Sequence, residues 1–189
     1  MKIYTRTGDS GETGLAGGGR VSKDSLVIET VGTIDEVNAV LGIVRSFSLP
    51  DNIQNQLQET QSRLFDAGAV VASKEGYDCG VAIEAKESEW LEKRIDEFTQ
   101  ELPTLRHFIL PGGHPAAAHT HQARSVCRRA ERLLVSLQEE TENPLGDILI
   151  YLNRLSDYLF VLARTLNALH SEKEMIWSGA SRNSDQSAS

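Results

Sequence analysis

Cysteine is scarce in this sequence, and its placement excludes two common ways of stabilising a small protein. The 189 residues include two cysteines, Cys79 and Cys127, which lie far apart and form no C-x-x-C pair. Such thiols can build neither a disulfide framework nor a cysteine-based zinc site. A chain of this length can bury roughly 70% of the surface of its unfolded state, so it needs no cross-link. We expect one domain with free thiols.

Long apolar runs and an excess of positive charge are also missing. Unbroken apolar runs such as Leu159–Ala163 reach only about five residues, whereas a helix that crosses a bilayer needs about 20. The first residues are polar and lead into glycine, unlike a secretory signal. The formal net charge is −8, from 19 Lys and Arg against 27 Asp and Glu. We therefore expect a cytoplasmic protein with no membrane or nucleic-acid partner, in which any anion site is a local cluster of cations.

Glycine is concentrated in the first 32 residues, which hold seven of the fifteen glycines in the chain. An interior glycine costs a helix about 1 kcal/mol relative to alanine, so this segment is not expected to be a regular helix. Short extended pieces are predicted at residues 2–5 and 26–31. We expect residues 1–32 to form a glycine-rich arm.

After the arm, apolar residues recur at steps of three and four, which predicts helices. Thr33 is the predicted cap of the first helix, and Leu49-Pro50 ends it. The last helix carries leucines at alternating steps of four and three, the pattern of a bundle seam. The further helices are expected over about 53–72, 86–101, 115–140 and 145–169.

The predicted fold is therefore all-α, a five-helix bundle of the ferritin-like topology class with a glycine-rich N-terminal arm. The bundle would cover residues 33–170, and residues 1–177 would form a single domain. Residues 178–189 are polar enough to be a disordered tail.

The glycine-rich arm offers a cradle for phosphate. Small residues let backbone N–H groups converge on an oxyanion, and Arg6, Arg20 and Lys23 add positive charge. The segment is not a Walker loop, because Arg20 and Val21 stand where that motif requires Lys and then Ser or Thr. The alternative on these residues alone is a flexible arm without a ligand.

A stripe of arginines lies on the predicted helix 115–140. Arg124, Arg128 and Arg132 are spaced four residues apart, so they share one face and repel one another. At 100° per residue, this face points away from the core positions around Val126. The stripe is either a solvated surface partly neutralised by Glu131, or a contact for polyphosphate or for another subunit.

The sequence does not indicate a metal site made of protein ligands. His114, His119 and His121 are spaced five and two residues apart, which does not bring all three to one helical face. No E-x-x-H motif is present, so the ligands of a di-iron bundle are missing. Asn153 and Asp157, one turn apart on the seam helix, could bind a ligand or simply bond to a neighbouring helix.

Six long motifs span most of residues 3–164. They are, in order, IYTRTGDSGETGL, GGGRVSK, VGTIDEVNAVLG, FILPGG, RSVCRRAER and YLNRLSDYLFVLAR. Together they closely resemble the PduO-type ATP:cob(I)alamin adenosyltransferases, or corrinoid adenosyltransferases. The resemblance implies transfer of the 5′-deoxyadenosyl group from ATP to cob(I)alamin, which gives adenosylcobalamin and triphosphate. It also implies a homotrimer with ATP bound between subunits.

The resemblance further implies roles for single residues. Lys23 and Arg128 would contact the ATP phosphates, and Phe108 would lie under the corrin ring as an apolar wedge that excludes the lower axial ligand. Asp35 and Arg124 would form an inter-subunit ion pair close to the site. Mg²⁺ would be held mainly by phosphate oxygens. The other residues implied around ATP are Thr5, Arg6, Thr7, Gly8, Thr13, Gly14, Arg129, Ala130, Glu131, Arg132 and Asn153.

Cob(I)alamin is itself a strong nucleophile, so such a protein would mainly position cobalt in line with C5′ and neutralise charge on the leaving triphosphate. A reductase and an adenosylcobalamin-dependent enzyme would be its partners, and Trp177 could close over the corrin. Two alternatives remain on the sequence. One is a non-catalytic ATP- or corrinoid-binding or cofactor-delivery module, and the other is a purely structural helical oligomer.

Overall fold

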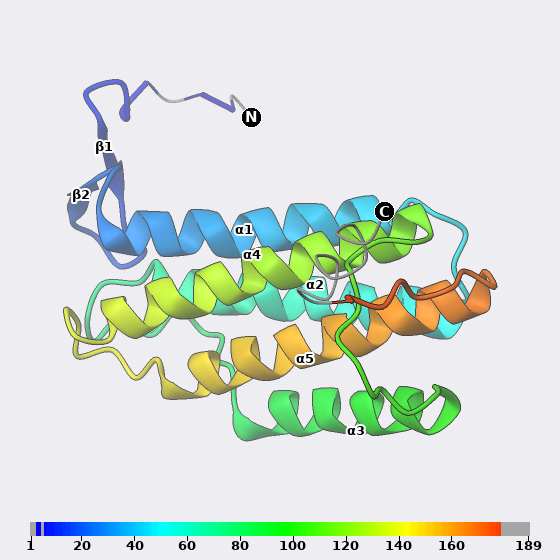
Figure 1. The fold of residues 1–189 in the computed structure, drawn as a ribbon. Coiled ribbons are helices and arrows are strands. Elements are labelled where there is room, and N and C mark those ends of the chain that lie inside the picture. Colours follow the sequence, from blue (N-terminus) through cyan, green and yellow to red (C-terminus); the bar gives the residue numbers. More distant parts are fainter. Residues whose placement is uncertain (1–2, 5, 179–189) are drawn as a thin grey trace, which may run out of the picture.

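The computed structural model describes residues 3–4 and 6–178, which form a helical bundle with a small β-hairpin at one end (Figure 1). The hairpin pairs β1 (Glu12–Gly14) with β2 (Arg20–Ser22) in antiparallel register. The predicted all-α fold of five helices is confirmed. The helices are α1 (Leu26–Arg45), α2 (Asp51–Val71), α3 (Ala85–Glu101), α4 (Pro115–Leu137) and α5 (Gly146–Leu169).

The core lies between α1, α2, α4 and α5. Helix α1 packs against α2 and α4, and α4 packs against α5. The predicted seam of α5 is buried, with Leu152, Leu155 and Leu159 inaccessible to solvent. In the described part of the chain, no helix combines the length and the apolar character needed to cross a membrane.

Helix α3 forms an outer layer on α5 (Figure 1). Its apolar contacts centre on the buried ring of Tyr158, whose centroid lies 6.4 Å from that of Trp90 and 6.1 Å from that of Phe98. Arg154 of α5 adds an ion pair of 2.8 Å with Glu92 of α3.

The first helix begins well before Thr33, so the prediction that this residue is the cap is wrong. The Thr33 hydroxyl instead donates to the carbonyl of Glu29 within α1, at 2.8 Å. Residues 26–31 are likewise helical rather than extended. Leu26 and Val31 pack against the core, which offsets the helix cost of Gly32.

Both cysteines are free, as the sequence predicts. Cys127 is buried between α4 and α5, where its thiol donates to the carbonyl of Leu152 at 3.3 Å. Burial raises the pKa of this thiol well above its ordinary value. Cys127 is therefore a core residue rather than a nucleophile. The predicted disordered tail lies outside the described residues, except for Ser178.

The arm is joined to the end of the bundle through Ala16. Its N–H donates to the carbonyl of Ala72 at 3.0 Å, and its carbonyl accepts from the N–H of Lys74 at 2.9 Å. Gly17 has a φ of +80° and lies so close to Tyr77 that an added Cβ would stand 2.3 Å from the ring. The hairpin therefore rests on the loop after α2, at one end of the bundle (Figure 1).

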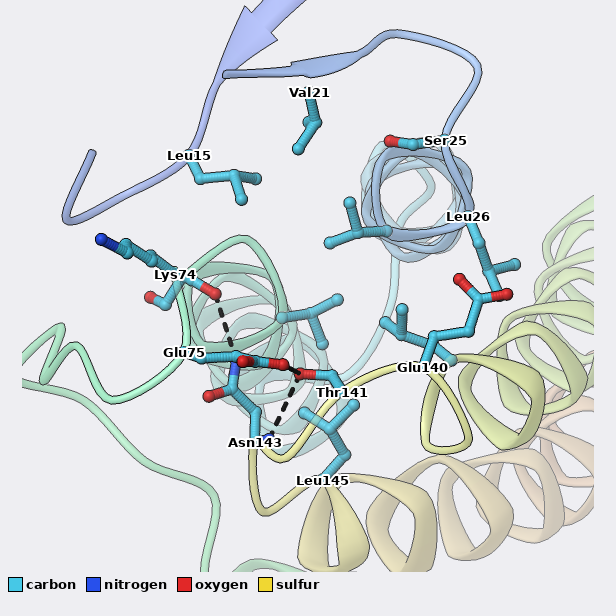
Figure 2. Close-up of a pocket in the computed structure, with 14 residues that line it drawn as sticks. Leu15, Val21, Ser25, Leu26, Lys74, Glu75, Glu140, Thr141, Asn143 and Leu145 are labelled. Carbon is cyan, nitrogen blue, oxygen red and sulfur yellow. Dashed lines mark hydrogen bonds between the residues drawn. The ribbon is translucent and has the colours of Figure 1, made fainter. Parts of the chain in front are cut away.

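A pocket of about 410 Å³ lies where the arm meets the bundle (Figure 2). Leu15 of the arm faces the loop between α4 and α5 across this pocket. In that loop, Asn143 donates through its side chain to the carbonyl of Ser73, at 3.1 Å, and Thr141 donates to Glu75, at 3.0 Å. No residue predicted to bind a ligand lines this pocket. It is the junction of the arm rather than the candidate site.

Candidate functional site

A groove of about 760 Å³ runs between the arm, α1 and α2 and brings together four of the predicted site residues. Thr13 and Gly14 come from β1, Lys23 follows β2, and Asp35 comes from α1. The wall is largely apolar and includes the exposed ring of Phe65 on α2. The groove therefore suits a ligand with an anionic part and an apolar or aromatic part.

Lys23 lies at the arm side of this groove, beside Gly8. A Cβ built on Gly8 would stand 3.1 Å from the ammonium nitrogen of Lys23, so the absence of a side chain there makes room for the lysine. The backbone N–H of Lys23 donates to the carbonyl of Gly11 at 2.9 Å. Lys23 is exposed, and within the described residues no carboxylate forms an ion pair with it, so a ligand could reach its charge.

Arg20, the first residue of β2, makes its contacts within the arm itself. Its Nε lies 3.2 Å from a carboxylate oxygen of Glu12, and its Nη2 donates to the carbonyl of Thr7 at 2.7 Å. It thereby ties the loop before β1 to the hairpin. Arg6 has a φ of +60° and lies over the ring of Tyr4, while Thr5 falls outside the described residues.

The predicted stripe of α4 faces away from the bundle core. Arg128 and Arg132 are exposed, and Arg132 donates to the carbonyl of Arg128 at 2.9 Å. The three predicted residues between these two arginines are either paired with another residue of the chain or buried. Arg129 pairs with Glu36 of α1, Ala130 is buried, and Glu131 accepts a hydrogen bond of 2.8 Å from Asn153 of α5.

Arg124 begins the stripe in a different environment, half-buried against α5. Its guanidinium carbon lies 6.0 Å from the centroid of Phe160, and its Nε is buried without a hydrogen-bond partner in the described structure. Burial, and then the charge of Arg128, lower the pKa of Arg124. No acidic side chain of the described chain forms an ion pair with it, so Arg124 lacks a counter-charge.

Phe108 lies in the loop between α3 and α4, and this loop meets both helices at the end of the bundle opposite the arm (Figure 1). Its ring is 78% exposed, and that of Trp177 meets it edge-on with the centroids 6.3 Å apart. An exposed aromatic pair of this kind presents an apolar surface that a flat ligand could cover.

The described residues contain no cluster of three or more His, Cys, Asp or Glu side chains placed to hold a metal ion. Asp35 is the one carboxylate that lines the groove. A divalent cation bound there would take most of its oxygen ligands from its own substrate rather than from the protein.

The chain is similar to known proteins along most of its length. The sequence model of the family described as cobalamin adenosyltransferase matches residues 3–166. A corrinoid adenosyltransferase of Bacillus subtilis is 44% identical over 175 residues, which cover 89% of this chain and 88% of that protein. A cobalamin adenosyltransferase of Cupriavidus metallidurans is 43% identical over 180 residues, which cover 93% and 94%.

The chain belongs to the cobalamin adenosyltransferase family.

A solved member of the cobalamin adenosyltransferase family has the same fold. It is a variant of the PduO-type ATP:corrinoid adenosyltransferase from Lactobacillus reuteri complexed with cobalamin and ATP. The TM-score is 0.87 at 36% identity, over 94% of this chain and 99% of that one. The family resemblance predicted from the sequence motifs is confirmed.

The structure also gives a partner to Arg164, the last residue of the stretch YLNRLSDYLFVLAR, to which the sequence motifs assign no role. Arg164 is buried in α5 and pairs with Glu174, beyond the end of that helix. The sequence does contain a signal for this pair. An arginine within a run of core leucines requires a partner, because a charged group is almost never fully buried alone.

Proposed function

We propose that this protein transfers the 5′-deoxyadenosyl group from ATP to cob(I)alamin and forms adenosylcobalamin and triphosphate. The observation that carries the proposal is the match to this family along nearly the whole chain, including a relative that binds both cobalamin and ATP. The groove supports it, because Lys23 lies there next to an apolar wall that could accept a nucleoside.

We propose that each ATP site is completed by a second subunit of a homotrimer. The groove and the arginine stripe are built from different elements, and no hydrogen bond or ion pair of the described residues joins them. Asp35 is exposed and Arg124 is half-buried, and neither forms an ion pair with another residue that the structure describes. These two side chains are complementary, so a neighbouring copy could satisfy both and place Arg128 opposite Lys23.

In this reaction the protein must position the two substrates and stabilise the negative charge that develops on triphosphate. Cob(I)alamin supplies the electron pair that forms the cobalt–carbon bond, and the C5′–oxygen bond breaks with its electrons leaving on triphosphate. Lys23, Arg128 and a phosphate-bound Mg²⁺ would neutralise that charge. Phe108 would cover the corrin face from which the lower axial ligand must depart. No general base is required.

The remaining assignments complete the proposal. Residues 1–177 would act as one adenosyltransferase domain in the cytoplasm, supplied with electrons by a reductase and serving an adenosylcobalamin-dependent enzyme. The residues proposed around ATP besides Lys23 and Arg128 are Thr5, Arg6, Thr7, Gly8, Thr13, Gly14, Arg129, Ala130, Glu131, Arg132 and Asn153.

An anaerobic assay tests the activity directly. The purified protein is mixed with ATP, Mg²⁺ and chemically reduced cob(I)alamin, and the corrin absorption spectrum is followed. We expect a light-sensitive adenosylcobalamin spectrum and release of triphosphate. A spectrum that stays at cob(I)alamin while ATP still binds would contradict the proposal and favour the non-catalytic binding module.

The phosphate role of Arg128 has its own test. Removing one group that stabilises charge in a transition state typically lowers the rate by about 100-fold or more. We expect Arg128→Ala to lower kcat/KM by that factor. Lys93→Ala is the matched control, because it removes an exposed positive charge from α3, away from both surfaces. A wild-type kcat/KM for Arg128→Ala would show that the assigned role is wrong.

A further inference from the structure

A buried ion pair joins α5 to the segment that follows it. Arg164 is only 6% exposed, and its Nε and Nη2 lie 2.7 and 3.2 Å from the two carboxylate oxygens of Glu174. This bidentate arrangement is the one that best compensates a buried guanidinium for the loss of water. The same Nη2 donates to the carbonyl of Pro103 at 2.9 Å. One guanidinium thus connects α5, the loop after α3 and the C-terminal segment.

Two backbone hydrogen bonds extend this connection to Phe108. The N–H of Trp177 donates to the carbonyl of Phe108 at 2.8 Å, and the N–H of Leu110 donates to the carbonyl of Met175 at 2.7 Å. The result is a short antiparallel bridge between residues 108–110 and 175–177. We call residues 174–177 the strap.

The strap needs an anchor. An isolated two-stranded pairing is marginally stable in water, and this one has only two hydrogen bonds. Phe108 and Trp177 are largely exposed, so packing against the core does not fix them either. The strap and the loop close over a small pocket of about 260 Å³ in which Arg164 and Glu174 meet. The ion pair, with the bond to Pro103, is a buried contact that joins both the strap and the loop to α5.

We propose that Arg164 and Glu174 are positioning residues for adenosyl transfer, which fix Phe108 against the corrin face through the strap. The inference rests on the proposed function, because that function assigns the corrin to Phe108. Without the ion pair, the strap detaches and Phe108 no longer excludes the lower axial ligand. The step that becomes slower is the one-electron reduction of cob(II)alamin to cob(I)alamin by an external reductant, because this reduction is favoured when the lower axial ligand is absent.

The test compares two routes to product in the Glu174→Gln variant. We expect kcat to fall by about ten-fold or more when cob(II)alamin and a chemical reductant are supplied, since small displacements of a positioned group have large effects on rate. With cob(I)alamin already reduced, kcat should stay within about three-fold of wild type, and KM for ATP should not change. Equal losses by both routes would overturn the positioning role.

A second measurement does not depend on activity. Amide hydrogen exchange of Leu110 and Trp177 reports whether the bridge is formed. We expect protection of both amides in the wild-type protein and loss of it in Glu174→Gln and in Arg164→Lys. Unchanged protection in Glu174→Gln would overturn the anchoring role. If the wild-type protein proves inactive, the proposed function falls, and the exchange result alone decides whether the pair anchors the Phe108 loop.

Glu92→Gln is the matched control. Among the described residues, it breaks the other ion pair that α5 makes outside its own helix, between Arg154 and Glu92 at 2.8 Å. This pair joins α5 to α3 and does not contact the strap. Both readouts should remain at their wild-type values in this variant, and a similar loss there would assign the effect to the stability of α5 in general.

Discussion

His121 illustrates at the scale of one residue how burial sets charge. Its side chain is 3% exposed in α4, and neither ring nitrogen has a hydrogen-bond partner in the described structure. The ring of Phe160 lies 6.1 Å away, centroid to centroid. Burial, and then the nearby charge of Arg124, lower the pKa of His121 from 6.5 to about 4, although Glu174 acts in the opposite direction. The imidazole is therefore neutral at pH 7.

This depressed pKa predicts a loss of stability in acid. The unfolded state binds a proton near pH 6.5 and the folded state only near pH 4, so between these values protons favour unfolding. The free energy of unfolding therefore decreases as the pH falls from 6.5 to 4, and His121 accounts for at most about 3 kcal/mol of this decrease.

Urea denaturation at pH 7 and pH 4 measures the effect. The His121→Gln variant cannot take up this proton, so its free energy of unfolding should decrease less between the two pH values than that of the wild type. His107→Gln, at an exposed position, should retain the wild-type decrease. An identical decrease in the wild type and in His121→Gln would contradict the assignment.

The spacing of residues in the sequence could predict part of the exposure of the arginines on α4. It predicts correctly that Arg128 and Arg132 face away from the core, because helical geometry alone determines which positions share a face. It could not predict that Arg124 is half-buried against Phe160. That contact depends on how α4 and α5 pack, and it has no local pattern in the chain.

At the scale of the elements, the loops are pinned by a few side chains from the helices. Asn167, at the end of α5, accepts a hydrogen bond of 2.9 Å from the N–H of His114 and donates one of 3.0 Å to the carbonyl of Gly112. Gly113 between them has a φ of +97°, and a Cβ there would stand 2.2 Å from the Asn167 side chain. The loop that carries Phe108 therefore enters α4 through a site that accepts only glycine.

Gly113→Ala is expected to destabilise the protein by about 3 kcal/mol. An alanine at positive φ costs about 1 kcal/mol or more, and the displaced Asn167 would lose its hydrogen bonds as well. Gly76→Ala separates the two effects, because Gly76 has a φ of +73° but open space around it. Urea denaturation should show a clearly larger loss for Gly113→Ala, and equal losses would argue against the collision with Asn167.

The elements differ in how far the sequence could predict them. Apolar periodicity predicts α2 to α5 to within a few residues, since those helices bury one face each. It fails at the start of α1, where Thr33 satisfies its hydroxyl inside the helix. The strap could not be predicted at all, because two backbone hydrogen bonds and one distant ion pair leave no repeating pattern in the sequence.

At the scale of the whole molecule, the proposed substrate contacts lie on surfaces that the bundle keeps apart. The arm lies at one end of the bundle, and the loop between α3 and α4 meets these helices at the other end (Figure 1). The groove is next to the arm, and the arginine stripe is on α4. The formal net charge of the chain is −8, yet Lys23 lies in the groove and Arg128 and Arg132 are exposed on α4. Because these cations lie on separate surfaces of one chain, we expect subunits to assemble around the nucleotide.

The proposed assembly predicts that Asp35→Lys weakens the trimer. Leaving Arg124 without a partner in an interface costs about 2 kcal/mol or more, which corresponds to a dissociation constant raised by about 30-fold or more. Sedimentation velocity over a range of concentrations measures this. Glu29→Lys is the control, as it reverses an exposed charge elsewhere on α1. A wild-type profile and full activity in Asp35→Lys would contradict the inter-subunit pair.

The outer position of α3 has a consequence for how the molecule comes apart. Four helices form most of the core, whereas α3 adds Leu91 and Phe98 to it and contacts mainly α5, through rings around Tyr158 and one ion pair. Detachment of α3 would leave the contacts among the other four helices in place, so the first cuts by a protease at low concentration should fall in α3 and its flanking loops. Because the loop that carries Phe108 begins at the end of α3, detachment of this one helix would also free that loop at one of its two ends.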